Sequence, residues 1–270
     1  MNRVKLLHMW SYRHNNFTVH QLPALKDNYI YLIEMHNSET LIAVDPAEAV
    51  SISRFCKASG KQLTHIINTH HHWDHTDGNI TLKEKFHALV IAAAGDGHRI
   101  PAIDTPISEH AQPEIDDLNI TVLSLPGNTR GHIGYLIDDA LFCGDVLFGA
   151  GCGRIFEGTH QQMWQSLCKL ASLPSDTKLY CAHEYTLANL RFAQAVDPVN
   201  EMLSQRINDD TRTRMDKQPT IPSTISLELA TNPFLRPLDK AFCNHYARQN
   251  NISDDALAVF SDLRTRKDNY

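Results

Sequence analysis

The feature that most constrains this chain is a run of metal-binding side chains, THHHWDH, at positions 69–75. The run directly follows LTHIIN, a largely apolar stretch that is typical of a buried β-strand. In extended backbone, side chains two residues apart share a face, so His70 and His72 can bind one ion together. A tight turn after them can direct Asp74 and His75 towards a second point. Because imidazole and carboxylate groups suit ions such as zinc, the spacing predicts a metal site at the end of a strand.

The chain divides into parts that differ in predicted secondary structure. Residues 17–184 contain apolar, strand-like runs interleaved with helix-like stretches, which favours a layered α/β architecture. Residues 185–270 have the pattern of helices, the last of them capped by Ser253, so we expect a separate helical domain. Residues 1–16 contain no acidic residue and no sustained apolar core, so we expect a disordered extension rather than a secretory signal.

The composition disfavours several classes of protein. With a formal net charge of −6 over 270 residues, the chain has no basic footprint for nucleic acid and no cationic face for a membrane surface. No apolar run in the sequence is long enough to span a bilayer. The six cysteines form no Cys-x-x-Cys pair and no secretion signal precedes them, so we expect free thiols in the cytoplasm. No apolar surface stripe is evident, and we expect a monomer.

Two more ligand-type residues stand at the ends of apolar runs. Asp145 ends one in LFCGDVLF, where a buried carboxylate is costly unless it is paired, caps backbone amides or binds a metal. His183 ends another in YCAHEYT, although such a residue alone is more often a hydrogen-bonded core histidine. With the first motif, the candidate ligands are His70, His72, Asp74, His75, Asp145 and His183. Two four-coordinate ions that share one carboxylate and one hydroxide take seven protein ligands, so we expect the seventh at the remaining strand end, LPGNTRGH.

These motifs, in this order and with PGNTRGHIGY between them, resemble those of the metallo-β-lactamase fold superfamily. Within it, the stretches DNYIYLI, GAGCGRIFEGT, AHEYTLANLRFA, TNPFLR and RTRKDNY are similar to those of the glyoxalase II (hydroxyacylglutathione hydrolase) family. The resemblance implies an αββα sandwich with a C-terminal helical domain that binds substrate. It also implies two divalent ions, with zinc expected and iron or manganese as alternatives. The implied reaction hydrolyses S-D-lactoylglutathione to glutathione and D-lactate, a step of methylglyoxal detoxification.

The resemblance also implies roles for individual residues. His70 and His72 would bind the first ion and Asp145 would bridge the two, while the second ion would take Asp74, His75 and His183. We expect hydroxide, hydrogen-bonded to Asp145, to attack the thioester carbonyl, and we take Asp145 and Asp74 as the catalytic residues. The implied substrate contacts are Arg154, Phe156, Tyr185, Arg264 and Lys267, of which Phe156 stands where the family often has tyrosine. From charge alone, Arg264 and Lys267 would be an ordinary charged helix end.

The sequence departs from the family pattern at Asn128, where a histidine ligand of the first ion is expected. Asparagine offers a neutral carbonyl oxygen, which is a weaker zinc ligand than imidazole. We therefore predict a weakened first site, an intact second site and reduced activity. The nearby His132 is an alternative ligand that the sequence leaves open.

Other functions follow from the same motifs. A glutathione-conjugate binder with little or no turnover is the first alternative, because Asn128 removes one ligand. A mononuclear-iron persulfide dioxygenase on the same fold is less favoured, since that family uses the missing histidine and lacks this helical tail. A β-lactamase is disfavoured because nothing indicates secretion and the C-terminal cations suit a peptide-like thiol carrier.

Overall fold

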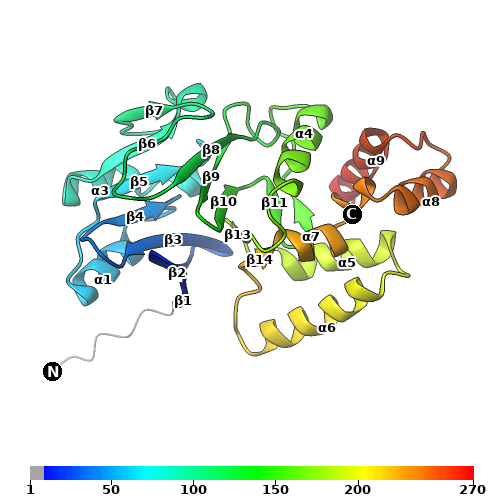
Figure 1. Cartoon of the computed structure of the whole chain (residues 1–270), viewed down its shortest axis with the longest axis horizontal. Helices are drawn as coiled ribbons and strands as arrows, with labels where there is room; N and C mark the ends of the chain where they lie inside the picture. The colour runs from blue at the N-terminus through cyan, green and yellow to red at the C-terminus, as the bar shows by residue number, and fades with distance from the viewer. Residues whose placement is uncertain (1–8) are drawn as a thin grey trace. The chain divides into compact units, whose positions relative to one another are not determined.

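The computed structural model (Figure 1) describes residues 9–270. The chain divides into two compact units. The first unit comprises the chain up to Leu123 together with Gly131–Asp138. The second unit comprises Ser124–Arg130 and Asp139–Tyr270. The chain therefore leaves the first unit, returns for eight residues and leaves again.

A seven-stranded sheet forms the centre of the first unit. Its strands follow chain order from β1 to β7, antiparallel up to β4 and parallel from β4 to β7. The strands are β1 Trp10–Arg13, β2 Phe17–Ala24, β3 Asn28–Met35, β4 Leu41–Val44, β5 His65–Asn68, β6 Leu89–Ala93 and β7 Thr105–Ile107. The connecting helices are α1 Val50–Ser59, α2 Trp73–Thr76, α3 Asn79–Phe86 and the short η1 Ala94–Asp96.

Strand β1 corrects the expectation that residues 1–16 form a disordered extension. Residues 1–8 lie outside the described part of the chain, but Trp10–Arg13 pair with β2 in antiparallel register. The Tyr12 hydroxyl donates to Gln21 Oε1 at 2.9 Å, which ties the strand's side chains to its neighbour. The expectation is therefore wrong for residues 10–13, because the edge of β2 provides partners that a sequence alone does not reveal.

Buried aliphatic side chains hold α1 against the sheet. Ile52 and Phe55 of this helix are at most 5 % exposed and belong to one apolar cluster with Leu32, Leu41 and Ile66. Burying each such side chain contributes about 2 kcal/mol, so the packing fixes the parallel strands β4 and β5. Their carboxyl ends, where the histidine motif begins, are fixed with them.

The second unit combines short strands with six helices. Strand β10 (Ala140–Gly144) runs parallel to β13 (Lys178–Cys181), which pairs antiparallel with β14 (Ser223–Thr224). Between them, β11 (Leu147–Phe148) and β12 (Gly151–Cys152) form a two-stranded hairpin. The helices are α4 His160–Ala171, α5 Thr186–Val196, α6 Glu201–Met215, α7 Ile225–Thr231, α8 Lys240–Asn250 and α9 Ala256–Asp268, with the short η2 Arg236–Leu238. Strands β8 (Ile120–Ser124) and β9 (Ile133–Ile137) are neighbours and belong, apart from Ser124, to the first unit.

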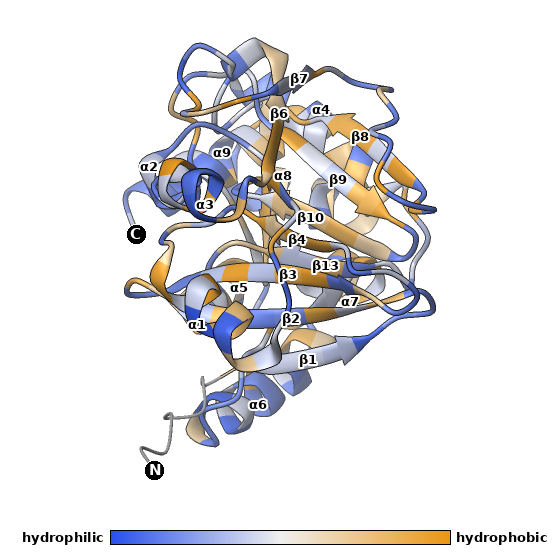
Figure 2. Ribbon diagram, turned by 90° about the vertical axis from the view of Figure 1, so that its left-hand side faces the viewer, coloured by the Kyte–Doolittle hydropathy of each residue, from blue (hydrophilic) through white to orange (hydrophobic). Residues whose placement is uncertain are grey.

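Hydropathy differs between the buried strands and the most polar helix (Figure 2). Strands such as β6, β8 and β10 are mainly hydrophobic, whereas α6 is mainly hydrophilic. Within residues 9–270, no helix has both the length and the apolar character that crossing a membrane requires. In the same part of the chain, no disulfide bond joins the cysteines.

Candidate metal centre and substrate site

The first unit carries the histidine motif in the loop after β5 and in α2. The Asn68 side chain, at the end of β5, donates to the backbone oxygen of His75 at 2.8 Å and so folds the loop back on the strand. His70 and His75 are fully buried, and their ring centroids lie 4.0 Å apart. His70 Nε2 lies 2.9 Å from His72 Nδ1, and His75 Nε2 lies 3.7 Å from a carboxylate oxygen of Asp74. Four nitrogen and oxygen donors thus gather at one end of the sheet.

Asp45 is a residue of this cluster that the sequence analysis missed. It follows β4, is 4 % exposed, and accepts hydrogen bonds from the backbone and hydroxyl of Thr69 at 2.7 and 2.6 Å. Its second oxygen lies 3.0 Å from His75 Nδ1. This contact places the ring proton on Nδ1 and makes Nε2 the acceptor nitrogen, as a metal ligand requires. The sequence pattern that could have identified Asp45 is the one used for Asp145, an acidic residue at the end of an apolar run.

Asn28 is a second residue that the sequence analysis missed. Its side-chain amide donates to Asp74 Oδ2 at 3.0 Å and to the Asp74 backbone oxygen at 3.2 Å. Asn28 is 6 % exposed and stands at the start of β3. Nothing in its local sequence indicates this role, because the contact joins positions that are far apart in the chain.

The other histidines of the first unit have different surroundings. His71 Nδ1 lies 3.0 Å from Asp96 Oδ2, and Arg99 also pairs with this carboxylate. Burial alone would raise the pKa of Asp96, but the hydrogen bonds from His71 and Arg99 outweigh it and lower that pKa. His132 is fully buried, and its ring stacks on His70 with centroids 4.6 Å apart. The alternative ligand considered above therefore lies beside the cluster.

The second unit contributes Asp145 and His183. Asp145 directly follows β10 and His183 comes two residues after β13, so both lie at the carboxyl ends of adjacent parallel strands. His183 Nε2 lies 3.3 Å from Asp145 Oδ1. The Tyr185 ring stacks on His183 with centroids 4.7 Å apart and an interplanar angle of 3°. The second unit thus holds a carboxylate and an imidazole together, with an aromatic ring against them.

Asn128 is held in one orientation within the second unit. Its side-chain nitrogen donates to the Arg154 backbone oxygen at 3.0 Å, and its own backbone oxygen accepts from Phe156 and Glu157. The side chain is 1 % exposed, and within residues 9–270 its Oδ1 atom has no hydrogen-bond partner. A buried carbonyl oxygen without a donor is costly, so this atom is suited to accept a cation or a water molecule. The donor set of the second unit therefore fits a metal ion.

The predicted substrate contacts differ in exposure: Arg264 is buried, and the others are exposed or half-buried. Arg154 and Phe156 are exposed, and Lys267 is half-buried. Burial, followed by the nearby cations Arg264, Arg191 and Arg154, lowers the pKa of Lys267. These four cations therefore form one electropositive region. Such a region favours a carboxylate ligand.

Arg264 occupies a different position from the other predicted contacts. It is 3 % exposed, its Nη1 donates to the Cys152 backbone oxygen at 3.0 Å, and its Nη2 lies 2.8 Å from Asp268. Its guanidinium group also packs over Phe234 at 4.9 Å from the ring centroid. Within the second unit, Arg264 thus anchors the backbone that leads into Arg154.

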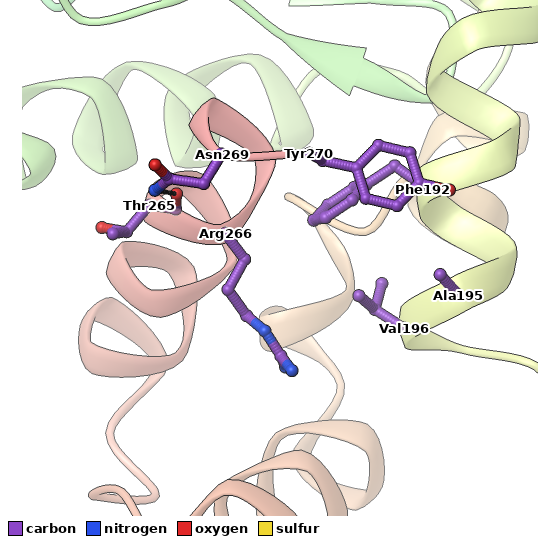
Figure 3. A pocket seen from close by; sticks show the side chains of 7 residues that line it. All are labelled: Phe192, Ala195, Val196, Thr265, Arg266, Asn269 and Tyr270. Carbon is purple, nitrogen blue, oxygen red and sulfur yellow. Dashed lines mark hydrogen bonds between the residues drawn. The ribbon is translucent and has the colours of Figure 1, made fainter.

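A separate pocket of about 390 Å³ lies between α5 and α9 (Figure 3). It is lined by Phe192, Ala195, Val196, Thr265, Arg266, Asn269 and Tyr270. Lys267 Nζ lies 5.2 Å from the ring centroids of both Phe192 and Tyr270, two residues that line this pocket. None of the predicted ligands or substrate contacts lines it, so it is distinct from the donor clusters.

Comparisons with known proteins cover both units. Residues 184–270 match the family model "Hydroxyacylglutathione hydrolase C-terminus", and residues 25–103 and 95–183 match "Metallo-beta-lactamase superfamily". A hydroxyacylglutathione hydrolase of Methylococcus capsulatus is 44 % identical over 250 residues, which are 92 % of this chain and 96 % of the relative. One from Synechococcus is 46 % identical over 259 residues, 92 % of this chain and 98 % of the relative.

The solved structure of ETHE1 from Myxococcus xanthus aligns with a TM-score of 0.62 at 23 % identity, over 92 % of this chain and 98 % of that one. This likeness concerns the fold. Together with the family models, it confirms the expected α/β metallo-β-lactamase-like fold with a C-terminal helical region. This superfamily's fold implies a pair of divalent metals, and the described donors include a histidine and aspartate cluster. The chain belongs to the hydroxyacylglutathione hydrolase family of the metallo-β-lactamase superfamily.

Proposed function

We propose that this chain hydrolyses S-D-lactoylglutathione, and related 2-hydroxyacyl thioesters of glutathione, to glutathione and the free hydroxy acid. The observation that carries the proposal is the match of residues 184–270 to the hydroxyacylglutathione hydrolase C-terminus, which contains Tyr185 and Lys267. The two relatives share 44 % and 46 % identity with nearly the whole chain, which supports the same conclusion. The monomeric state, the cytoplasmic location and the boundary of the helical domain near residue 184 stay predictions.

We propose that two divalent ions are held by the six predicted ligands. His70 and His72 serve the first ion, Asp145 serves both, and the second ion takes Asp74, His75 and His183. Imidazole nitrogen and carboxylate oxygen accept zinc, iron and manganese, and zinc is our first expectation. A bound ion of this kind lowers the pKa of water to near 7 and so supplies hydroxide at neutral pH.

The chain's own residues orient the reactants. The Asp145 carboxylate can accept a hydrogen bond from the attacking water and direct its lone pair towards the thioester carbonyl. Asp45 fixes the His75 ring, and Asn28 fixes the Asp74 carboxylate, through the hydrogen bonds described above. The departing thiolate is stable near neutral pH, so the chain needs no strong general acid.

The exposed residues of the second unit account for recognition of glutathione. Arg154 and Lys267 carry positive charge in one region, which suits the carboxylates of a tripeptide. Tyr185 and Phe156 present aromatic surface, and Phe156 is 62 % exposed. We propose that these four residues contact substrate directly. Arg264 acts through the backbone that it anchors.

We propose that Asn128 weakens the first metal site. Its buried Oδ1 is the only atom of that side chain that can bind a cation, because the amide nitrogen donates a hydrogen bond to the Arg154 backbone oxygen. A neutral oxygen donates less strongly to zinc than imidazole does.

A thioester hydrolysis assay tests the function. Loss of thioester absorbance is followed with the purified chain alone and with added zinc, iron or manganese. We expect turnover that rises with added metal and is abolished by a chelator. Tight binding of the glutathione conjugate without turnover at any metal concentration would establish the alternative, a binding protein without hydrolase activity.

A further inference from the structure

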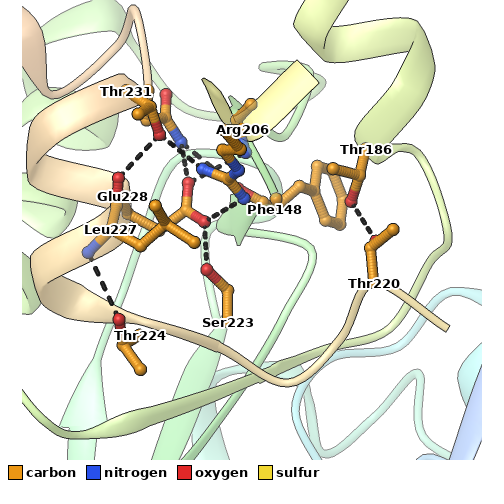
Figure 4. Close-up of polar contacts among 12 residues, drawn as sticks. Phe148, Thr186, Arg206, Thr220, Ser223, Thr224, Leu227, Glu228 and Thr231 are labelled. Atoms are coloured by element: carbon orange, nitrogen blue, oxygen red, sulfur yellow. Dashed lines mark hydrogen bonds and ion pairs between the residues drawn. The ribbon is translucent and has the colours of Figure 1, made fainter. Parts of the chain in front are cut away.

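A buried charged network lies in the second unit, apart from the predicted ligands (Figure 4). Its centre is the Glu228 carboxylate on α7, which is fully buried. One oxygen accepts from Arg206 Nη2 at 2.7 Å and from the Ser223 hydroxyl. The other accepts from the Asn232 side chain at 2.9 Å and from the backbone nitrogen of Ala150 at 2.8 Å. A carboxylate in this environment is tolerated only because every lone pair has a donor.

The network holds the tip of the β11–β12 hairpin, residues 148–151. Asn232 Nδ2 also donates to the backbone oxygens of Phe148 and Gly151, at 3.2 and 2.9 Å. The Asn189 side chain on α5 donates to the Gly149 oxygen at 3.0 Å. Ala150 has φ 52°, a left-handed conformation that costs a residue with a side chain about 1 kcal/mol. Polar groups from the helices therefore impose an unfavourable backbone shape on the hairpin.

The two arms of this hairpin end at residues with proposed functions. One arm begins just after Asp145, and the other leads directly into Arg154. The arms are closed together where Gly153 N donates to the Val146 oxygen at 3.1 Å. A β-carbon on Gly153 would overlap the Asp145 backbone oxygen, so the segments that flank the two strands are in close contact there. A shift of the tip therefore displaces Asp145 and Arg154 as well, because the two arms are short and in close contact.

We propose that Arg206, Glu228 and Asn232 are positioning residues for the proposed metal ligand Asp145 and the proposed substrate contact Arg154. The inference rests on the proposed function, which gives those two residues their roles. The helical region then has a structural role in the metal centre in addition to its proposed contact with glutathione. By fixing the hairpin, the helices set the position of a metal ligand that lies outside them.

A matched pair of variants tests the proposal. Glu228→Gln keeps the shape of the side chain but replaces one acceptor oxygen by a donor, so it cannot accept from both Arg206 and Ala150 N as the carboxylate does. Asp210→Asn is the control, because Asp210 pairs with the same arginine at 3.1 Å and, within residues 9–270, has no hydrogen bond to the hairpin. Each protein is loaded with zinc, and release to a chelator is timed beside KM, kcat and the thermal midpoint. Zinc release and kinetics are measured at a temperature well below the thermal midpoint of every variant.

We expect Glu228→Gln to release zinc about tenfold faster and to lose kcat about tenfold, the usual size of an indirect effect on metal ligands. Asp210→Asn should match the unmodified protein in zinc release and kcat, even where its thermal midpoint falls. A Glu228→Gln protein that loses thermal stability but keeps wild-type zinc release and kcat would overturn the proposal, because its role would then be structural only.

A milder variant covers the case in which Glu228→Gln does not fold. Asn189→Ser removes one hydrogen bond from the hairpin tip and leaves the Arg206–Glu228 pair intact. We expect a smaller but measurable acceleration of zinc release, and release at the wild-type rate would contradict the proposal. Because zinc release does not depend on turnover, a protein that holds zinc but fails to hydrolyse thioesters would refute the proposed function alone. A protein that holds no divalent metal would refute both.

Discussion

Asn128 is the residue at which we expect the candidate metal centre to depart from the family pattern. The amide is held by its nitrogen, and its buried oxygen has no hydrogen-bond partner within residues 9–270, so we propose that this oxygen serves as a weak ligand. We predict that Asn128→His raises zinc content after dialysis from about one ion per chain to about two, because imidazole binds zinc more strongly than a neutral amide. Metal analysis per chain and competition with a chelator measure this. Two tightly held ions in the unmodified protein, unchanged by the substitution, would contradict the weakened-site prediction.

Lys267 provides a prediction that depends on pH. Burial and three neighbouring arginines lower its pKa below the usual 10.5, so its positive charge is lost earlier than that of an ordinary lysine as pH rises. We expect KM for the thioester to be constant near neutral pH and to rise at alkaline pH, starting below 10.5. Lys267→Ala should have a KM about tenfold above that of the unmodified protein near neutral pH, with no alkaline rise, so that the two values approach each other at high pH.

Lys267→Arg is the matched control for this pH effect. Arginine stays charged throughout the alkaline range, so the variant should bind substrate at neutral pH and lose the alkaline rise in KM. If Lys267→Arg and the unmodified protein show the same alkaline rise, another group titrates and the prediction fails.

At this scale, sequence reasoning found side chains that share a motif and missed those that meet through the fold. The spacing of His70 and His72 predicts their proximity, since alternate residues in extended backbone share a face. Asp45 and Asn28 touch the same motif from β4 and β3, and their contacts span 30 and 46 positions of the chain. Local patterns contain no information on such pairs.

Among the elements, the β11–β12 hairpin gives the sharpest prediction. Gly153→Ala places a β-carbon on the Asp145 backbone oxygen, and backbone cannot move aside as a flexible side chain does. We expect a loss of about 3 kcal/mol in the free energy of unfolding and weaker zinc retention, because Asp145 is displaced. Chemical denaturation and zinc release to a chelator measure the two effects.

Gly60→Ala is the control for this substitution. Gly60 ends α1 with φ 77°, and a β-carbon there meets nothing within 4 Å. The variant should lose about 1 kcal/mol through backbone conformation alone and keep its zinc. Equal zinc retention in both variants would show that the hairpin does not position Asp145.

Element boundaries were less predictable than element types. The last helix was expected to be capped by Ser253, but the Asp255 side chain accepts from the Ala258 backbone nitrogen and begins it. Serine and aspartate are both good caps, so local sequence does not choose between positions two residues apart. The buried face of α9, with Val259, Phe260 and Leu263, decides which turn is the first.

For the whole molecule, the layered α/β class and the helical C-terminus followed from the sequence, because strand and helix periodicities are local properties. The division into units did not. Residues 124–130 join the second unit while residues 131–138 return to the first, although both belong to one short stretch of alternating loop and strand. Which unit a segment joins depends on partners that are distant in the chain.

The division into units also predicts how truncation affects the molecule. The proposed domain boundary near residue 184 cuts through the second unit, whose apolar cluster joins Ala150 to Leu190, Ala193 and Leu203 of the helices. Removal of residues 185–270 would also leave the backbone of the hairpin tip without the donors and acceptor that Asn189, Glu228 and Asn232 provide. We expect a 1–184 fragment to lack cooperative unfolding and to retain no zinc, whereas the full chain shows both.

Circular dichroism melts and metal analysis of the fragment beside the full chain measure this outcome. Adding the separate 185–270 fragment in trans is the control, since recovery of cooperative unfolding would show that the missing contacts, and not a damaged catalytic part, cause the defect. A 1–184 fragment that unfolds cooperatively and retains zinc as the full chain does would contradict the prediction. It would also show that the strands of the second unit need none of the helices after residue 184 to hold Asp145 and His183 in place.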